Sequence, residues 1–113
     1  MAFEFNGTPI ETNPQGYLVN QEDWSEDLAR AMAEAENIGE LTERHWDVIN
    51  YLRDEFFNNR ESQPNTRTII KAMSDQWGEK IKQGDLYTLF PLDPSKQGGR
   101  IAGLPESRRK GGY

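Results

Sequence analysis

Apolar residues near the start of the chain recur at two spacings, one typical of a strand and one typical of a helix. The opening FEFNGTPIE alternates apolar and polar side chains around Asn6-Gly7, a dipeptide that supplies the positive φ angles of a tight hairpin turn. A small β-hairpin is therefore predicted. After the turn at residues 14–16, a spacing of three and four residues predicts a helix capped by Asn20, with one apolar stripe: Trp24, Leu28, Ala31, Met32 and Ala35.

Two longer helices joined by a polar turn are predicted next. Thr42 can cap the first of them, and its apolar face repeats at helical spacing from Trp46 to Phe56. The segment at residues 58–65 is polar and contains a proline, so the following helix is expected from about Thr66. The fold class is mainly α with a small β-hairpin, and the two helices form a helix-turn-helix-like pair.

The last part of the chain is predicted to be separate from the folded body. A short helix capped by Ser95 would contain Gly98 and Gly99, which together cost roughly 2 kcal/mol relative to alanine. The residues after that helix show no apolar periodicity. We expect a helical domain with its hairpin over residues 1–94 and a flexible C-terminal arm over residues 95–113.

Charge is divided unequally along the chain. Residues 1–61 hold 14 acidic and 4 basic residues, and residues 62–113 hold 5 acidic and 9 basic ones. As a helix-turn-helix, the chain would present Arg67, Thr68 and Lys71 to DNA. An ordinary antiparallel helix pair explains the same pattern, and the acidic side chains of the preceding helix would repel phosphates. A DNA-binding transcriptional regulator is therefore the alternative function.

The residues available for chemistry are few, since the chain has no cysteine and only one histidine. Without cysteine, none of its side chains can form a disulfide, a thiolate metal site or a persulfide. His45 lies near Glu43 and Asp47 in sequence, but no nucleophile accompanies it, and a structural role is the favoured interpretation. We expect no metal and no cofactor.

The chain also carries no sign of a membrane or export segment. No stretch approaches the ~18 uncharged apolar residues of a membrane span, and the start MAFEFNG lacks a basic region followed by an apolar one. These features predict a cytoplasmic protein.

Several blocks of sequence, in the same order, resemble the DsrC/TusE family of sulfur-relay proteins, which includes the gamma subunit of dissimilatory sulfite reductase. The blocks are IETNPQGYL at 10–18, LTERHWDVINYLRDEF at 41–56, TRTIIKAM at 66–73, LYTLFP at 86–91, KQ at 96–97 and RIAGLP at 100–105. The resemblance implies a DsrC-like orthogonal helical bundle with an N-terminal hairpin and a flexible C-terminal arm. That fold agrees with the one predicted from the residue pattern.

The resemblance also implies where sulfur would be carried. Family members hold it on a cysteine second from the C-terminus, and some have another cysteine two residues after the lysine-glutamine pair. In this chain those positions are Gly112 and Gly99. We therefore expect a cysteine-less homologue that is not an enzyme, but a regulatory or adaptor protein that docks to partners of a sulfur-relay or sulfite-reductase system.

Four residues of the arm are the candidates for contact with such a partner. Lys96 and Arg100 are expected to meet acidic groups, while Ile101 and Leu104 are expected to enter an apolar groove. The sequence leaves the identity of the partner and the oligomeric state open.

Overall fold

A two-residue turn sets the register of the amino-terminal hairpin in the computed structural model, which describes residues 2–106. Strand β1 (Ala2–Phe5) pairs antiparallel with β2 (Thr8–Glu11). Asn6 and Gly7 have φ angles of 52° and 78°, the left-handed conformations that such a turn requires. The hairpin prediction is confirmed.

The first long helix begins later than the pattern predicted. A 3-10 turn, η1 (Gln21–Asp23), comes first, and α1 (Glu26–Ala35) follows it. Ser25 caps α1, because its extended backbone lets the side chain accept a hydrogen bond from the N–H of Leu28. Asn20, the expected cap, precedes the 3-10 turn and makes no side-chain capping hydrogen bond.

The predicted helix pair is present. Thr42 caps α2 (Glu43–Asn58), and His45 completes a capping box, since its Nδ1 accepts a hydrogen bond from the Thr42 N–H at 2.9 Å. The next helix, α3 (Thr66–Trp77), is capped by Asn65 and ends at Gly78, which adopts a left-handed φ of 68°. Both boundaries follow from local residue chemistry.

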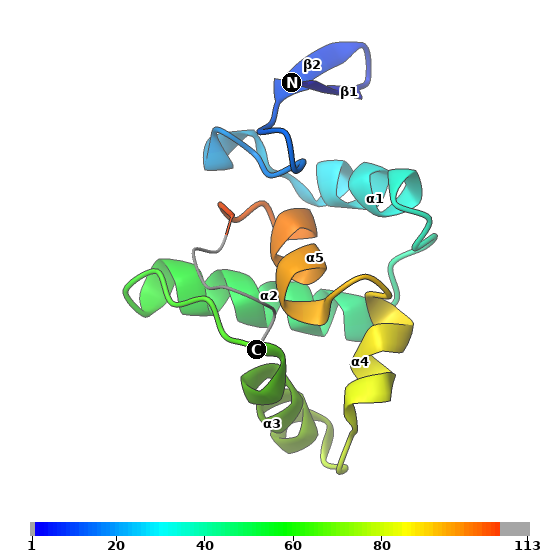
Figure 1. Ribbon diagram of the computed structural model, residues 1–113, viewed down its shortest axis with the longest axis vertical. Coiled ribbons are helices and arrows are strands. Elements are labelled where there is room, and N and C mark those ends of the chain that lie inside the picture. The colour runs from blue at the N-terminus through cyan, green and yellow to red at the C-terminus, as the bar shows by residue number, and fades with distance from the viewer. Residues whose placement is uncertain (1, 107–113) are drawn as a thin grey trace.

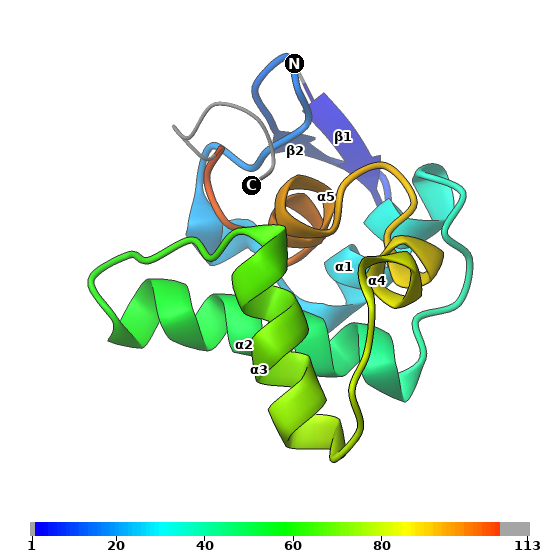
Figure 2. The ribbon, with the colours of Figure 1, turned by 60° about the horizontal axis from the view of Figure 1, so that its bottom comes forward.

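Helix α5 (Pro94–Ile101) lies at the centre of the fold and contacts α1, α2, α3 and the short α4 (Gln83–Leu89). Figures 1 and 2 show it enclosed by these helices, with the hairpin standing beyond α1. Asp93 caps α5 in place of the expected Ser95, accepting hydrogen bonds from the N–H groups of Ser95 and Lys96. Pro94 then occupies the first helical position, where its missing N–H costs nothing.

The boundary expected at residue 94 does not mark the edge of the core. A Cβ atom at Gly98 would lie 3.1 Å from Leu52, and one at Gly103 would lie 2.3 Å from Trp24. These glycines allow close packing, so residues 95–104 belong to the helical body, which corrects this part of the predicted arm. Met1 and residues 107–113, Gly112 among them, lie outside the described residues, and the rest of the arm stays a prediction.

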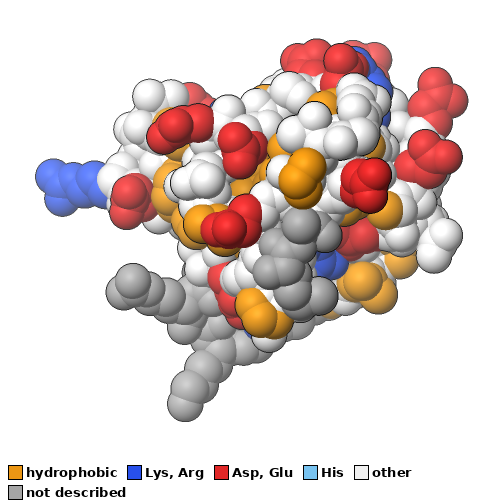
Figure 3. Space-filling model, turned by 90° about the horizontal axis from the view of Figure 1, so that it is seen from above, with side chains coloured by type: hydrophobic (Ala, Val, Ile, Leu, Met, Phe, Trp, Pro, Cys, Tyr) orange, Lys and Arg blue, Asp and Glu red, His pale blue; other side chains and the backbone are white. Residues whose placement is uncertain are grey.

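Acidic side chains are concentrated at one end of the long axis of the molecule. Residues 2–36, from the hairpin to the C-cap of α1, carry eight carboxylates and a single basic residue, Arg30. Viewed from this end, Figure 3 shows acidic side chains spread around hydrophobic ones. Residues 66–89, which include α3 and α4 at the opposite end of Figure 1, carry four basic and three acidic side chains. No helix within residues 2–106 is long and apolar enough to cross a bilayer.

Candidate functional site

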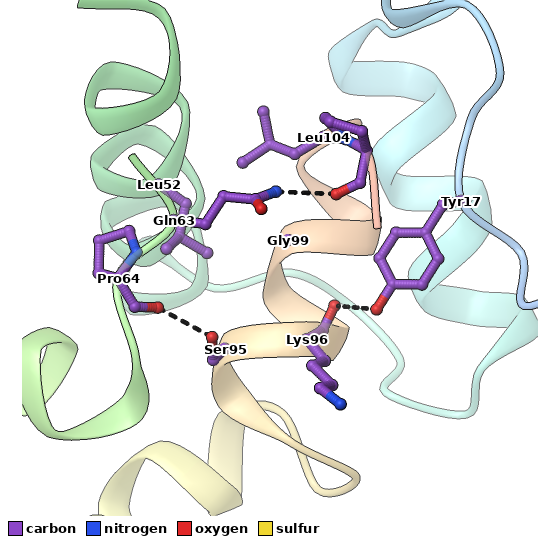
Figure 4. Close-up of a pocket in the computed structure, with 9 residues that line it drawn as sticks. Tyr17, Leu52, Gln63, Pro64, Ser95, Lys96, Gly99 and Leu104 are labelled. Carbon is purple, nitrogen blue, oxygen red and sulfur yellow. Dashed lines mark hydrogen bonds between the residues drawn. The ribbon is translucent and has the colours of Figure 1, made fainter. Parts of the chain in front are cut away.

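A small pocket lies against the face of α5 that contains Gly99 (Figure 4). We call it the Gly99 pocket, and its lining residues are Tyr17, Leu52, Gln63, Pro64, Ser95, Lys96, Gly99, Leu104 and Pro105. Its volume is about 10 Å³, close to the space that one water molecule needs. Segments far apart in the sequence therefore meet at the position that the family resemblance assigns to a cysteine.

Three hydrogen bonds fix the walls of the Gly99 pocket. The Ser95 hydroxyl donates to the Pro64 carbonyl at 2.8 Å, and the Gln63 amide donates to the Pro105 carbonyl at 2.8 Å. The Tyr17 hydroxyl donates to the carbonyl of Lys96 at 3.3 Å. Burial raises the pKa of the Tyr17 phenol, although the nearby Arg100 acts in the opposite direction, so the phenol stays protonated and able to donate at neutral pH.

Gly99 has no evident structural reason to be glycine. It lies inside a helix and does not have a positive φ. Apart from its chain neighbours and the backbone of its own helix, no heavy atom of the described residues lies within 4 Å of an ideal Cβ. Glycine in a helix interior costs about 1 kcal/mol relative to alanine. The position has room for a side chain that the sequence does not supply.

The two basic residues of α5 differ in their surroundings. Arg100 is held in a two-point ion pair with Glu36, at 2.8 Å and 2.6 Å, and their side chains are 16% and 19% exposed. The hydrogen bond to Glu36 raises the pKa of Arg100 despite its partial burial. Lys96 is half-buried, and no carboxylate within residues 2–106 lies in salt-bridge range of it. Lys96 is therefore the α5 cation available to a partner.

Two long side chains donate hydrogen bonds to carbonyl groups at the carboxyl end of α5 and hold it against the core. Trp24 Nε1 donates to the Ile101 carbonyl at 2.8 Å, and Arg53 Nη1 donates to the Ala102 carbonyl at 2.7 Å. The Arg53 guanidinium also stacks 3.8 Å from the centre of the Trp24 ring. Ile101 and Leu104 are 0% and 1% exposed, so neither presents a surface to a partner, which corrects the expectation that they enter a partner's groove.

The residues proposed for DNA contact are exposed but do not form an unopposed basic patch. Arg67, Thr68 and Lys71 lie on the surface of α3, and Lys71 is 3.9 Å from the carboxylate of Asp75. At the amino end of this helix, the N–H of Thr68 is already bonded, because it donates to the side chain of the capping residue Asn65. Contact with DNA through these residues stays a prediction.

His45 has a structural role, as the sequence favoured. Its Nδ1 serves the α2 capping box and its Nε2 lies 2.9 Å from the Leu89 carbonyl, so both ring nitrogens are engaged. Burial lowers the pKa of His45, which keeps the ring neutral at physiological pH. Within residues 2–106, no three histidine, aspartate or glutamate side chains lie close enough together to hold a metal ion.

Comparison with known sequences finds similarity over nearly the whole chain. Residues 4–109 match the family described as DsrC like protein. The sulfurtransferase TusE of Yersinia pseudotuberculosis is 47% identical over 104 residues, which is 91% of this chain and 94% of the relative. The sulfurtransferase TusE of Escherichia coli is 44% identical over 103 residues, covering 90% and 93%.

Solved structures agree with these relatives. The NMR structure of DsrC from Allochromatium vinosum has a TM-score of 0.82 at 38% identity and covers 96% of both chains. The oxidised gamma subunit of dissimilatory sulfite reductase from Archaeoglobus fulgidus has a TM-score of 0.84 at 33% identity, covering 96% of this chain and 98% of that one.

These similarities correct the expectation that the chain is not an enzyme, and they give no support to a DNA-binding or a regulatory role. Relatives of nearly half-identical sequence are sulfurtransferases, so the expectation that the chain is not an enzyme is wrong as a statement about its class. None of the matched proteins named above is described as a DNA-binding or regulatory protein.

Proposed function

Because this chain belongs to the DsrC family of sulfur-relay and sulfurtransferase proteins, we propose that it works in a sulfur relay as the docking component for a partner that holds the sulfur. Docking takes place at the Gly99 pocket and the adjacent Lys96. The proposed role is that of an adaptor, which brings a sulfur-bearing partner to the relay.

The open space at Gly99 is the observation that most supports this proposal. With no cysteine in the chain, any sulfane sulfur handled at this pocket must be held by a thiol of the partner. The missing side chain leaves room for a small incoming group at the position where, by the family resemblance, some members carry a cysteine. Lys96 lines the same pocket, and a cation beside a thiolate or persulfide favours its anionic form.

The partner class follows from what the relatives are called. One relative is a sulfurtransferase, and one structural neighbour is a gamma subunit of dissimilatory sulfite reductase. We infer that the partner of this chain belongs to a sulfur-relay or sulfite-reductase system, in the cytoplasm.

Binding measurements with matched variants test the docking surface. Purified sulfur-relay and sulfite-reductase proteins from the same organism would be titrated against this chain by calorimetry. We expect Gly99→Leu to fill the space and Lys96→Glu to repel the partner, each weakening binding by about tenfold or more. Lys71→Glu, an exposed change on α3, is the control and should leave the affinity unchanged. Equal affinities for all four proteins, or no binding by the unaltered chain, would remove the proposal.

Installing a thiol tests the geometry of the pocket separately. In Gly99→Cys, the new thiolate can attack the outer sulfur of a persulfidated donor, forming a protein persulfide while the donor's thiolate leaves. Intact-mass spectrometry should show a gain of one sulfur atom in the variant, with the unaltered chain as the baseline. If the new thiol is alkylated by iodoacetamide but gains no sulfur from the donor, the pocket does not admit a persulfide.

A further inference from the structure

The hairpin is the element least covered by the rest of the protein. Its two strands pack against each other more closely than against any helix, and Phe3, Phe5 and Ile10 on its inner face are only partly buried. A groove of about 560 Å³ lies beside it, with Phe3, Met32 and Leu92 among its lining residues. Two strands alone are marginally stable in water, and a third strand with an apolar face stabilises such a sheet.

The two edges of the hairpin are not equivalent. Pro9 lies opposite Glu4 and has no N–H, so this pair is the non-hydrogen-bonded kind, in which backbone groups point away from the partner strand. The outer edge of β2 therefore lacks a donor at Pro9, and farther along it the Glu11 carbonyl already accepts from the Val19 N–H at 3.1 Å. The outer edge of β1 offers both the N–H and the carbonyl of Glu4, and no third strand pairs with it among residues 2–106.

Side chains along β1 define what an added strand must look like. Phe3 and Phe5 share the inner face, which is partly buried against the core, and Glu4 lies exposed on the outer face. Side chains directly opposite one another on neighbouring strands interact, and opposite charges are favourable there. An added strand therefore needs apolar residues at one set of alternate positions and basic residues at the other.

The acidic surroundings of the hairpin also favour a partner strand that carries basic residues. Of the eight carboxylates in residues 2–36, only three lie within 4 Å of a basic side chain of the described residues: Glu26 and Asp27 with Arg30, and Glu36 with Arg100. A second copy of this chain would bring another acidic strand beside Glu4, which like-charge repulsion disfavours.

We propose that the free edge of β1 binds an extended segment of a partner protein in which basic and apolar residues alternate. The backbone of the segment pairs with Glu4, its basic side chains lie beside the Glu4 carboxylate, and its apolar side chains cover Phe3 and the groove. Leu92, which also lines the groove and is 69% exposed, would be covered by the same apolar side chains. This surface is separate from the Gly99 pocket and does not depend on the function proposed for it.

A synthetic octapeptide of alternating lysine and valine is a suitable probe, and a peptide of the same composition with lysines and valines in separate blocks is its control. Titration of isotope-labelled protein should shift the amide resonances of residues 3–5 and Leu92 and slow hydrogen exchange at the Glu4 amide. Glu4→Lys should weaken binding by about tenfold and favour an alternating glutamate and valine peptide instead. Glu22→Lys, a change at the same acidic end but outside the strands, should have little effect.

Several results would overturn this proposal. Equal binding of the block peptide, or equal losses from Glu4→Lys and Glu22→Lys, would show general attraction to an acidic surface. If removal of residues 107–113, without any added peptide, produced the same resonance shifts, the occupant of the edge would be the chain's own C-terminal segment. A dimer that forms through the hairpin and is altered by Glu4→Lys would assign the edge to a second copy.

Discussion

The hairpin and α5 are both short, but they are held in place by different parts of the sequence. The hairpin is specified by its own turn, and its strands contact each other more than anything else. Helix α5 is enclosed by four helices, and its last carbonyls accept hydrogen bonds from Trp24 and Arg53, 77 and 49 residues away. One element is set locally, and the other depends on the complete fold.

Two glycines with the same φ angle show how the requirement for glycine differs between the hairpin and α5. Gly7 in the hairpin turn and Gly103 after α5 both have a φ of 78°. Apart from its two chain neighbours, no residue within 2–106 has an atom within 4 Å of a Cβ built at Gly7, whereas a Cβ at Gly103 would lie 2.3 Å from Trp24 Cδ1. The turn needs only the conformational freedom of glycine, and the end of α5 needs both that freedom and the absence of a side chain.

The largest expected effect separates these two requirements. Gly103→Ala should lower the free energy of unfolding by about 3 kcal/mol, because left-handed strain and displacement of Trp24 add together. Gly7→Ala carries the strain alone and should cost about 1 kcal/mol. Urea unfolding of both variants measures the difference. Equal losses would show that Trp24 yields without cost and that α5 is no more tightly packed than the hairpin.

A smaller effect should come from acid, acting on the helical body through His45. Burial lowers the pKa of His45, so the folded state binds a proton less readily than the unfolded chain, whose histidine has a pKa of about 6.5. Its contribution to stability is complete above that value and declines as the pH falls through the interval down to the folded-state pKa. His45→Gln should be about 2 kcal/mol less stable at pH of about 8, since two hydrogen bonds are disturbed.

The pH dependence of that variant is the decisive measurement. Between about pH 7 and pH 5, His45→Gln should lose less stability than the unaltered chain, because one titrating group has been removed. Parallel curves for the two proteins would show that other groups account for the whole response.

The smallest expected effect is a gain in stability. Gly99→Ala should raise the free energy of unfolding by about 1 kcal/mol, because alanine is the better helix former and the site has space for a methyl group. Gly98→Ala, one residue earlier, would place its methyl 3.1 Å from Leu52 and should gain less. If Gly99→Ala is destabilising, α5 is packed as tightly at the Gly99 pocket as it is at Gly103.

Features specified by neighbouring residues could be predicted from the sequence. Asn6-Gly7 and the Thr42 cap act on the residues beside them, and each is present as expected. The start of α1 was misplaced because Asn20 and Ser25 are both suitable caps, and only the intervening 3-10 turn decides between them.

The role of α5 could not be predicted from residue pattern because glycine has two opposite uses. Gly98, Gly99 and Gly103 indicate chain flexibility when only neighbours in sequence are considered, whereas the fold uses Gly98 and Gly103 for close contacts. The Gly99 position itself was identified through the family resemblance. Its walls at Tyr17 and Gln63 come from distant segments, and no spacing in the sequence brings them to α5.

The position of α5 also bears on how the protein is made. The helix at the centre of the structure follows α1 to α4 in the chain, so all four leave the ribosome before the element on which they pack. Until residues 94–104 are available, the apolar faces of the earlier helices have no common surface to bury. The earlier helices can therefore close into the observed arrangement only after α5 has emerged, when contacts across long sequence separations can form.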